Sequence, residues 1–136
     1  MMTAVRILGG IVAGLVLAFA LVILLELLSS VLHPFPKDVE QTHEEICAHV
    51  ARYPHWALAL LGILGWSATA FASVRLAMRI GNLPAGITVS VILGLLVACN
   101  IGMLPYALWF KLAMPCCLAA ACVAGVMSAR KGKPAA

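Results

Sequence analysis

Charged residues are scarce in this chain. They make up 10% of its 136 residues and aromatic residues 7%, whereas 64% are hydrophobic and the mean hydropathy is +1.09. Soluble domains are about 25% charged, so this composition excludes a water-soluble domain with an ordinary polar surface. A disordered chain is excluded too, because disorder goes with few apolar residues and much charge. The sequence therefore predicts an integral membrane protein in contact with the lipid bilayer.

Motifs for catalysis and cofactor binding are also missing. The sequence has no P-loop, no G-x-G-x-x-G, no G-x-S-x-G and no C-x-x-C. Phosphate cradles, dinucleotide sites, nucleophile elbows and redox pairs depend on these spacings. Basic residues are not interleaved with aromatic residues on a soluble segment. We therefore expect no enzymatic activity, no cofactor and no nucleic-acid partner.

Long charge-free runs are abundant instead. A helix needs roughly 20 mostly apolar residues to cross about 30 Å of hydrocarbon. The runs predict one all-α domain over residues 1–136, a polytopic bundle of four antiparallel transmembrane helices. Turn-forming residues 81–84 (GNLP) and Pro105 mark the ends of the third span. The expected segments are spans at about 5–32, 54–78, 84–104 and 107–129, an outer loop at 33–53 and a tail at 130–136.

The first run has an alternative interpretation as a cleaved secretory signal peptide. The apolar region of a signal peptide has only about 7–15 residues. Residues 7–25 carry no charge, and the apolar character continues beyond Glu26 to Leu32. A retained membrane anchor is therefore predicted.

Basic residues are concentrated on one side of these spans. Six of the nine lie near the chain ends or the 2–3 connection, namely Arg6, Arg75, Arg79, Arg130, Lys131 and Lys133. The positive-inside rule then places both termini in the cytoplasm. All five acids lie at or toward the other face, where four aromatic residues form a predicted interfacial belt: Tyr53, Trp56, Tyr106 and Trp109. We expect a multi-pass protein of a bacterial inner membrane.

The outer loop at 33–53 is the one long hydrophilic segment. Residues 42–45 (THEE) match a capping box, in which the Thr42 hydroxyl accepts the amide of Glu45 and the Glu45 carboxylate reaches back to the Thr42 amide. This pattern predicts a short interfacial helix from about 43 to 52. One side of it is expected to face the membrane interface or the bundle, and the other to be more exposed. The first side comprises Ile46, Val50 and Tyr53, and the second comprises Glu44, His49 and Arg52.

Glu26 is the one acid inside a predicted span. A carboxylate in hydrocarbon is costly and usually faces the bundle interior, a cavity or a partner. One hypothesis is a proton or cation site, with His33 or Asn100 facing Glu26. The alternative is a hydrogen-bonded Glu that locks helix packing.

All four histidines lie on the outer side together with Cys47. His43 and Cys47 are four residues apart, an acceptable spacing for zinc or copper ligands on a helix, and His49 is a third candidate. Cys47 stands where the H-E-x-x-H pattern needs its second His, so a metalloprotease is not predicted. The alternative is that these are ordinary polar residues at the interface.

The five cysteines allow two interpretations. In membrane spans, Cys commonly packs as a small apolar residue. Cys47 and either Cys116 or Cys117 lie toward the outer, oxidising side and are candidates for a disulfide.

Small residues recur at a spacing of four. Such faces let helices approach closely in lipid. Packing inside the bundle is the favoured interpretation, and a homodimer face is the alternative. The pairs are Gly10 and Gly14, Ala68 and Ala72, Ala98 and Gly102, and Ala121 and Gly125.

Three segments together carry a resemblance to a known group of proteins. They are Glu26 followed by residues 33–36 (HPFP), residues 65–72 (GWSATAFA) with 75–80 (RLAMRI), and residues 100–110 (NIGMLPYALWF). The chain resembles short four-span bacterial integral membrane proteins of uncharacterised function. It departs from them at Ala72-Ser73, where members often carry Gly-Gly, and at Tyr106-Ala107, where they often carry His-Pro. The resemblance implies the four-span architecture and no activity.

Two functional hypotheses follow from the sequence. The first is a non-enzymatic accessory or assembly subunit, or a homo-oligomeric membrane protein, whose outer loop contacts a larger membrane complex. The second is a small transporter or channel component that moves protons or metal cations past Glu26 and the outer histidines.

Overall fold

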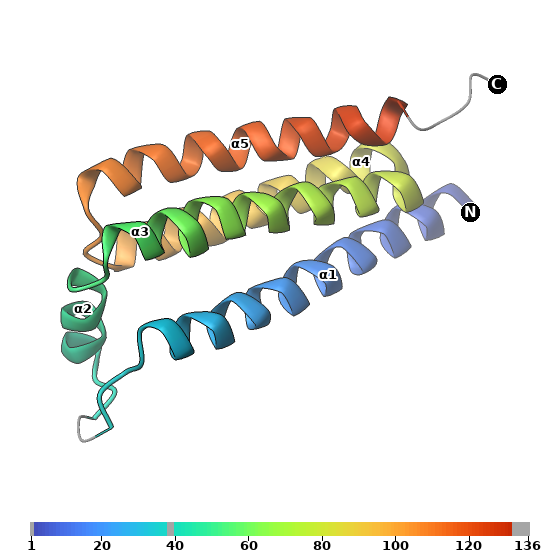
Figure 1. The fold of residues 1–136 in the computed structure, drawn as a ribbon. Helices are drawn as coiled ribbons and strands as arrows, with labels where there is room; N and C mark the ends of the chain where they lie inside the picture. The colour runs from blue at the N-terminus through green and yellow to red at the C-terminus, as the bar shows by residue number, and fades with distance from the viewer. Residues whose placement is uncertain (1, 38–39, 132–136) are drawn as a thin grey trace.

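The computed structural model describes residues 2–37 and 40–131, which are helical apart from short connections (Figure 1). No strand occurs within these two ranges, which confirms the all-α class. In chain order the elements are α1 (Met2–Leu32), α2 (His43–Ala51), α3 (His55–Ala57), the π-helix η1 (Leu58–Gly65), α4 (Trp66–Met103) and α5 (Leu108–Lys131).

Three helical segments are long and apolar enough to cross a membrane: Thr3–Leu32, His55–Met103 and Leu108–Lys131. The middle segment combines α3, η1 and α4 and has 49 residues. A straight helix of that length would be roughly 73 Å long, more than twice the hydrocarbon thickness of about 30 Å.

The middle segment is not straight, because α4 breaks at Asn82. The backbone there has φ 66° and ψ −166°. This combination of positive φ and extended ψ is essentially confined to glycine, so the backbone at Asn82 is strained. Pro84 follows within the first turn of the second half, where its missing N–H costs little. The chain reverses direction at this break (Figure 1), which lies between the predicted second and third spans.

α1 packs against α4 through its small residues. Gly10 and Gly14 are buried. A Cβ on Gly10 would lie 2.6 Å from the Gly81 amide nitrogen and 2.7 Å from the Ala77 carbonyl oxygen. A Cβ on Gly14 would lie 2.9 Å from Ala77 Cβ and 3.1 Å from Val89 Cγ2. The G-x-x-x-G pair is therefore used inside the bundle, where α1 contacts both halves of α4.

The remaining core repeats once per helical turn. Rows of buried side chains on the second half of α4 and on α5 face the interior, while large apolar side chains on α1 are exposed outward. The two rows are Ala85, Val89, Leu93 and Val97, and Phe110, Met114, Leu118 and Cys122. Such an apolar exterior suits a lipid environment.

The helix ends differ from the predicted boundaries mainly at the C-terminus. Arg130 and Lys131 were expected in a tail at 130–136, but they form the last turn of α5. Basic residues are favourable there because they interact with the helix dipole and the last carbonyl groups. Residues 132–136 lie outside the described ranges.

Substituting Gly10 tests the close approach of α1 and α4. We expect Gly10→Ala to lower the free energy of unfolding by about 1–3 kcal/mol, because the new Cβ would overlap backbone atoms that cannot rotate away. Gly9→Ala is the matched control, since its Cβ would meet only Ile80 Cγ2 at 4.0 Å. Unfolding in mild detergent, followed by circular dichroism, measures both. Equal stability of the two variants would contradict this packing.

Candidate functional site

A cavity of about 420 Å³ lies where the end of α1, α2 and the α4–α5 connection meet. We call it the Glu26 cavity. Its polar lining consists of Glu26, Ser29, Ser30, His33, His49, Tyr53, Asn100 and Tyr106. The apolar part of its wall includes Leu58, Leu61, Trp66, Val97, Phe110 and Met114. The cavity is therefore amphipathic.

The cavity exists because α1 diverges from the other long helices toward its C-terminal end (Figure 1). Near its start, Gly10 and Gly14 allow backbone contact with α4. Farther along, Leu25 packs against η1, and its Cδ2 lies 2.6 Å from where a Cβ on Gly65 would be. Beyond the glycine contacts α1 and α4 draw apart (Figure 1), and we call this arrangement the wedge.

One wall of the wedge is the π-helix η1. Leu58, Leu61 and Gly62 of this element line the cavity. A Cβ on Gly62 would lie 2.6 Å from Phe110 Cε2, so the glycine lets α5 come close. π-Helices are rare and are frequently found at functional sites. Sequence reasoning missed this element, because no residue pattern here distinguishes a π-turn from an α-turn.

Stacked rings join α2 to the end of α1. The His33 and His49 ring centroids are 4.2 Å apart at an interplanar angle of 27°, and Tyr53 meets His33 edge-on at 4.5 Å. Phe35 lies 4.9 Å from His49 on another side. A hydrogen bond between the Ser29 and Tyr53 hydroxyl groups completes the connection. Together these contacts hold α2 over the cavity.

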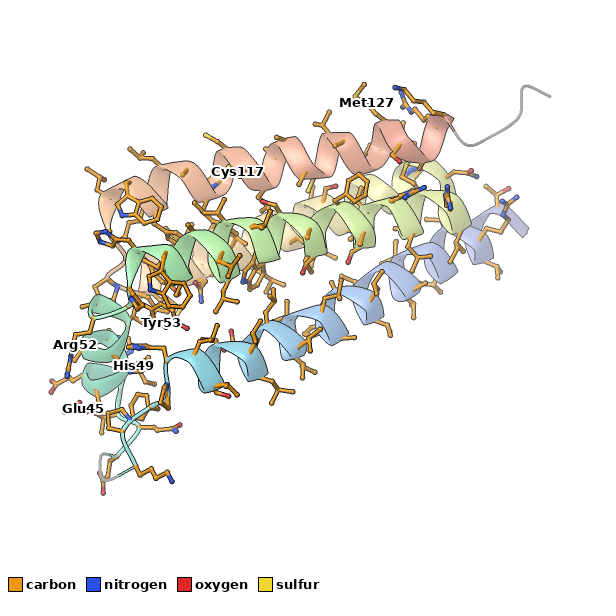
Figure 2. All side chains as sticks on the ribbon, viewed as in Figure 1. Glu45, His49, Arg52, Tyr53, Cys117 and Met127 are labelled. Carbon is orange, nitrogen blue, oxygen red and sulfur yellow. The ribbon has the colours of Figure 1, made fainter. Side chains whose placement is uncertain are left out.

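His49 was predicted to be exposed, and this prediction is wrong. It is half-buried and lies between α2 and the end of α1, whereas Arg52 is on the opposite side of α2 (Figure 2). The reason is helical spacing: His49 is three residues after Ile46 and four before Tyr53, so all three share one face.

At the start of α2, one of the two predicted capping-box hydrogen bonds is present. The Glu45 amide donates to the Thr42 hydroxyl at 3.4 Å, as predicted. The Thr42 amide, however, donates to the Glu40 carbonyl at 2.8 Å instead of to the Glu45 carboxylate. The nearby carbonyl satisfies this donor locally.

The three residues predicted as a proton or cation site come together. Glu26 from α1, His33 just after α1 and Asn100 from α4 all line the Glu26 cavity. His33 Nε2 is buried there without a hydrogen-bond partner among the described residues. The structure thus places the three residues around one cavity.

Tyr106 is a member of this site that sequence reasoning did not select. Burial raises the pKa of Tyr106 to about 12, and the charges of Glu26 and Tyr53 raise it as well. A side-chain hydrogen bond with Asn100 acts in the opposite direction. Tyr106 therefore remains a neutral phenol that can donate a hydrogen bond into the cavity.

The predicted metal ligands do not converge. His43 Nε2 and Cys47 Sγ are 3.6 Å apart on the exposed side of α2, but His49 is stacked on His33 instead. Within the part of the chain that the structure describes, no three His, Cys, Asp or Glu side chains are grouped to hold a metal ion.

The cysteines, all of which lie in the described ranges, are free thiols. Cys47 and Cys117 are half-buried, Cys116 is exposed and Cys122 is buried. The structure thus does not join Cys47 to Cys116 or Cys117.

No protein-family model, no curated protein and no solved structure matches this chain. The resemblance to four-span bacterial membrane proteins stays a prediction.

The His33–His49 stack predicts a pH dependence. Burial lowers the pKa of His49, as do the charges of His33 and Arg52, although a hydrogen bond with the His33 backbone raises it. As the pH falls below the ordinary value of 6.5, the undocked histidine takes up a proton first. The docking of α2 is therefore fully stable above that pH and weakens below it.

Hydrogen exchange of the α2 amides at about pH 7.5 and about pH 5.5, corrected for intrinsic rates, measures this change. We expect His49→Phe to abolish it, because Phe can stack without titrating. His43→Phe, on the exposed side of the same helix, should keep it. A pH response that survives in His49→Phe would assign the effect to another group.

Proposed function

We propose that this chain is a small, non-enzymatic transport component of a bacterial inner membrane that binds a proton or another cation in the Glu26 cavity. One observation carries the proposal. Glu26, His33 and Asn100, which are far apart in the sequence, line a single cavity together with His49 and Tyr106. The cavity supplies one carboxylate and several neutral hydrogen-bonding groups, a set suited to a small positive charge.

The proposed topology has four spans, because the break at Asn82 divides the 49-residue segment into two parts that are each long enough to cross. The start of α1 lies beside this break, where the Arg6 carbonyl is 2.9 Å from where a Cβ on Gly81 would lie. Arg130 shares a groove with Leu83 at the same end. The positive-inside rule places this basic end in the cytoplasm, and it places the Glu26 cavity and an interfacial α2 outside.

Charge compensation supports a cationic occupant. A carboxylate at the edge of hydrocarbon requires a proton, a cation or strong hydrogen bonds. No Lys or Arg in the described chain lines the cavity. The separation of His43 and Cys47 from His49 makes a proton or a non-metal cation a better occupant than a metal ion.

A second candidate function is a subunit of a homo-oligomer or larger membrane complex. Its support comes from Gly94 and Gly102. Apart from the neighbouring residues and backbone of their own helix, no described atom lies within 4 Å of where a Cβ on either glycine would be. Ala98 between them is also exposed. A partner helix could approach this face closely. Native mass spectrometry from mild detergent tests it: a stoichiometric assembly lost in Gly102→Leu supports the subunit role, and a monomer contradicts it.

Proton flux tests the transport function. We expect the purified chain, reconstituted in liposomes with a pH-sensitive dye inside, to dissipate a pH gradient faster than protein-free vesicles. Glu26→Gln should slow this flux by about tenfold or more, because the amide cannot exchange a proton at neutral pH. Glu44→Gln, an exposed acid on α2 outside the cavity lining, is the matched control. Unchanged flux in Glu26→Gln, or no flux from the parent, contradicts the proposal.

A further inference from the structure

Aromatic rings are concentrated around Glu26. The whole chain has four Phe, three Trp and two Tyr, and five of these nine residues line the Glu26 cavity. They are Phe35, Tyr53, Trp66, Tyr106 and Phe110. Some are mutually packed: the Tyr106 and Phe110 centroids are 4.8 Å apart. Phe110 belongs to the buried core, and Tyr53, Trp66 and Tyr106 pack against it, so aromatic rings form much of the wall around the carboxylate.

The charge of the lining limits the ligand to one sign. Glu26 is the acid of the cavity, and no Lys or Arg of the described residues lines it. Phosphate-headed lipids and other anions would meet the carboxylate without a compensating cation. Aromatic faces carry negative electrostatic potential and attract cations, and aromatic cages bind quaternary ammonium groups in this way.

The apolar part of the lining favours an organic cation over a hydrated inorganic one. A volume of about 420 Å³ lies within the range of about 300–1,000 Å³ for small-molecule pockets. Leu58, Leu61, Val97 and Met114 cannot replace the water ligands of a hydrated metal ion, but they can pack against hydrocarbon substituents.

We infer that the Glu26 cavity binds a lipophilic organic cation, such as a quaternary ammonium or phosphonium ion, with its charge beside Glu26 and the aromatic rings and its apolar substituents against η1 and α5. This inference rests on the proposed function, because it takes the Glu26 carboxylate to be the cation site. It adds the chemical class of the ligand.

Protons and the organic cation compete for the same carboxylate. Glu26 shares the cavity with His33 from the end of α1, His49 from α2, Tyr53 after α2 and Tyr106 from the α4–α5 connection. A proton on the carboxylate removes the charge that attracts the cation, so affinity for the cation should fall as the pH falls.

Tetraphenylphosphonium is a suitable probe, because its charge does not depend on pH. We expect isothermal titration calorimetry on the full chain in dodecyl maltoside, at about pH 8, to show saturable binding. Triphenylphosphine oxide, a neutral aromatic analogue, should bind about tenfold more weakly or worse. This pair of ligands tests the inference on the unmodified protein. Equal affinity for both ligands, or no binding of the cation, overturns it.

Two pairs of variants locate the bound cation. Glu26→Gln should weaken tetraphenylphosphonium binding about tenfold or more, and Glu44→Gln should leave it unchanged. Trp66→Leu should lower the affinity to about one-fifth of that of the parent, because the cation loses its interaction with the face of the indole ring. Trp56→Leu is the control, since Trp56 is 57% exposed and outside the lining. Parent-like binding in Glu26→Gln, with helical content intact by circular dichroism, places the cation elsewhere and overturns the inference.

The flux assay separates this inference from the proposed function. Proton flux that depends on Glu26, without tetraphenylphosphonium binding, leaves the proton site standing and rejects the organic cation. Tetraphenylphosphonium binding that depends on Glu26, without proton flux, supports the ligand class and rejects transport of protons by this chain.

Discussion

The backbone contact between α1 and α4 at Gly10 is the constraint on which the rest of the structure depends. In lipid there is little hydrophobic gain from bringing apolar helices together, so close packing must hold them. Gly10 and Gly14 provide that packing at one end of α1 only. The contact fixes one end of α1, the helix diverges from α4 toward its other end (Figure 1), and the Glu26 cavity opens there. The position of the site is therefore a consequence of where the small residues lie.

The same wedge explains why the polar residues of an apolar chain are where they are. An unsatisfied polar group in hydrocarbon is costly, and the exposed outer surface of the long helices is largely apolar. The cavity gathers hydroxyl, imidazole, amide and carboxyl groups from α1, α2 and α4. Ser29 pairs with Tyr53, and Asn100 with Tyr106. Glu26 is the acid of the lining, and no Lys or Arg of the described residues lines the cavity beside it.

The sequence predicted elements better than contacts. The break at Asn82 was predictable because a turn-forming tetrapeptide interrupts a long apolar run, and α2 was predictable from Thr42 and its helical spacing. Glu26, His33 and Asn100 were each predicted as site residues from the sequence. Their convergence depends on the tilt of α1. That tilt could not be predicted, because helices that are apolar on almost every side show no pattern that marks the contact face. His49 was misplaced because polarity alone was taken to indicate exposure. Tyr106 and Trp66 were not predicted as site residues, because the sequence does not distinguish an aromatic residue that lines a cavity from one at the membrane interface or in the core.

The arrangement couples the occupancy of the cavity to the position of α2. On the proposed function, the negative charge of Glu26 favours a bound cation, while the His33–His49 stack keeps α2 docked over the cavity. A fall in pH weakens that docking, because burial lowers the pKa of His49 and the undocked imidazole takes up a proton first. Undocking of α2 would uncover the cavity that holds the cation. Such a coupling needs no long-range pathway, because the acid and the histidines line the same cavity.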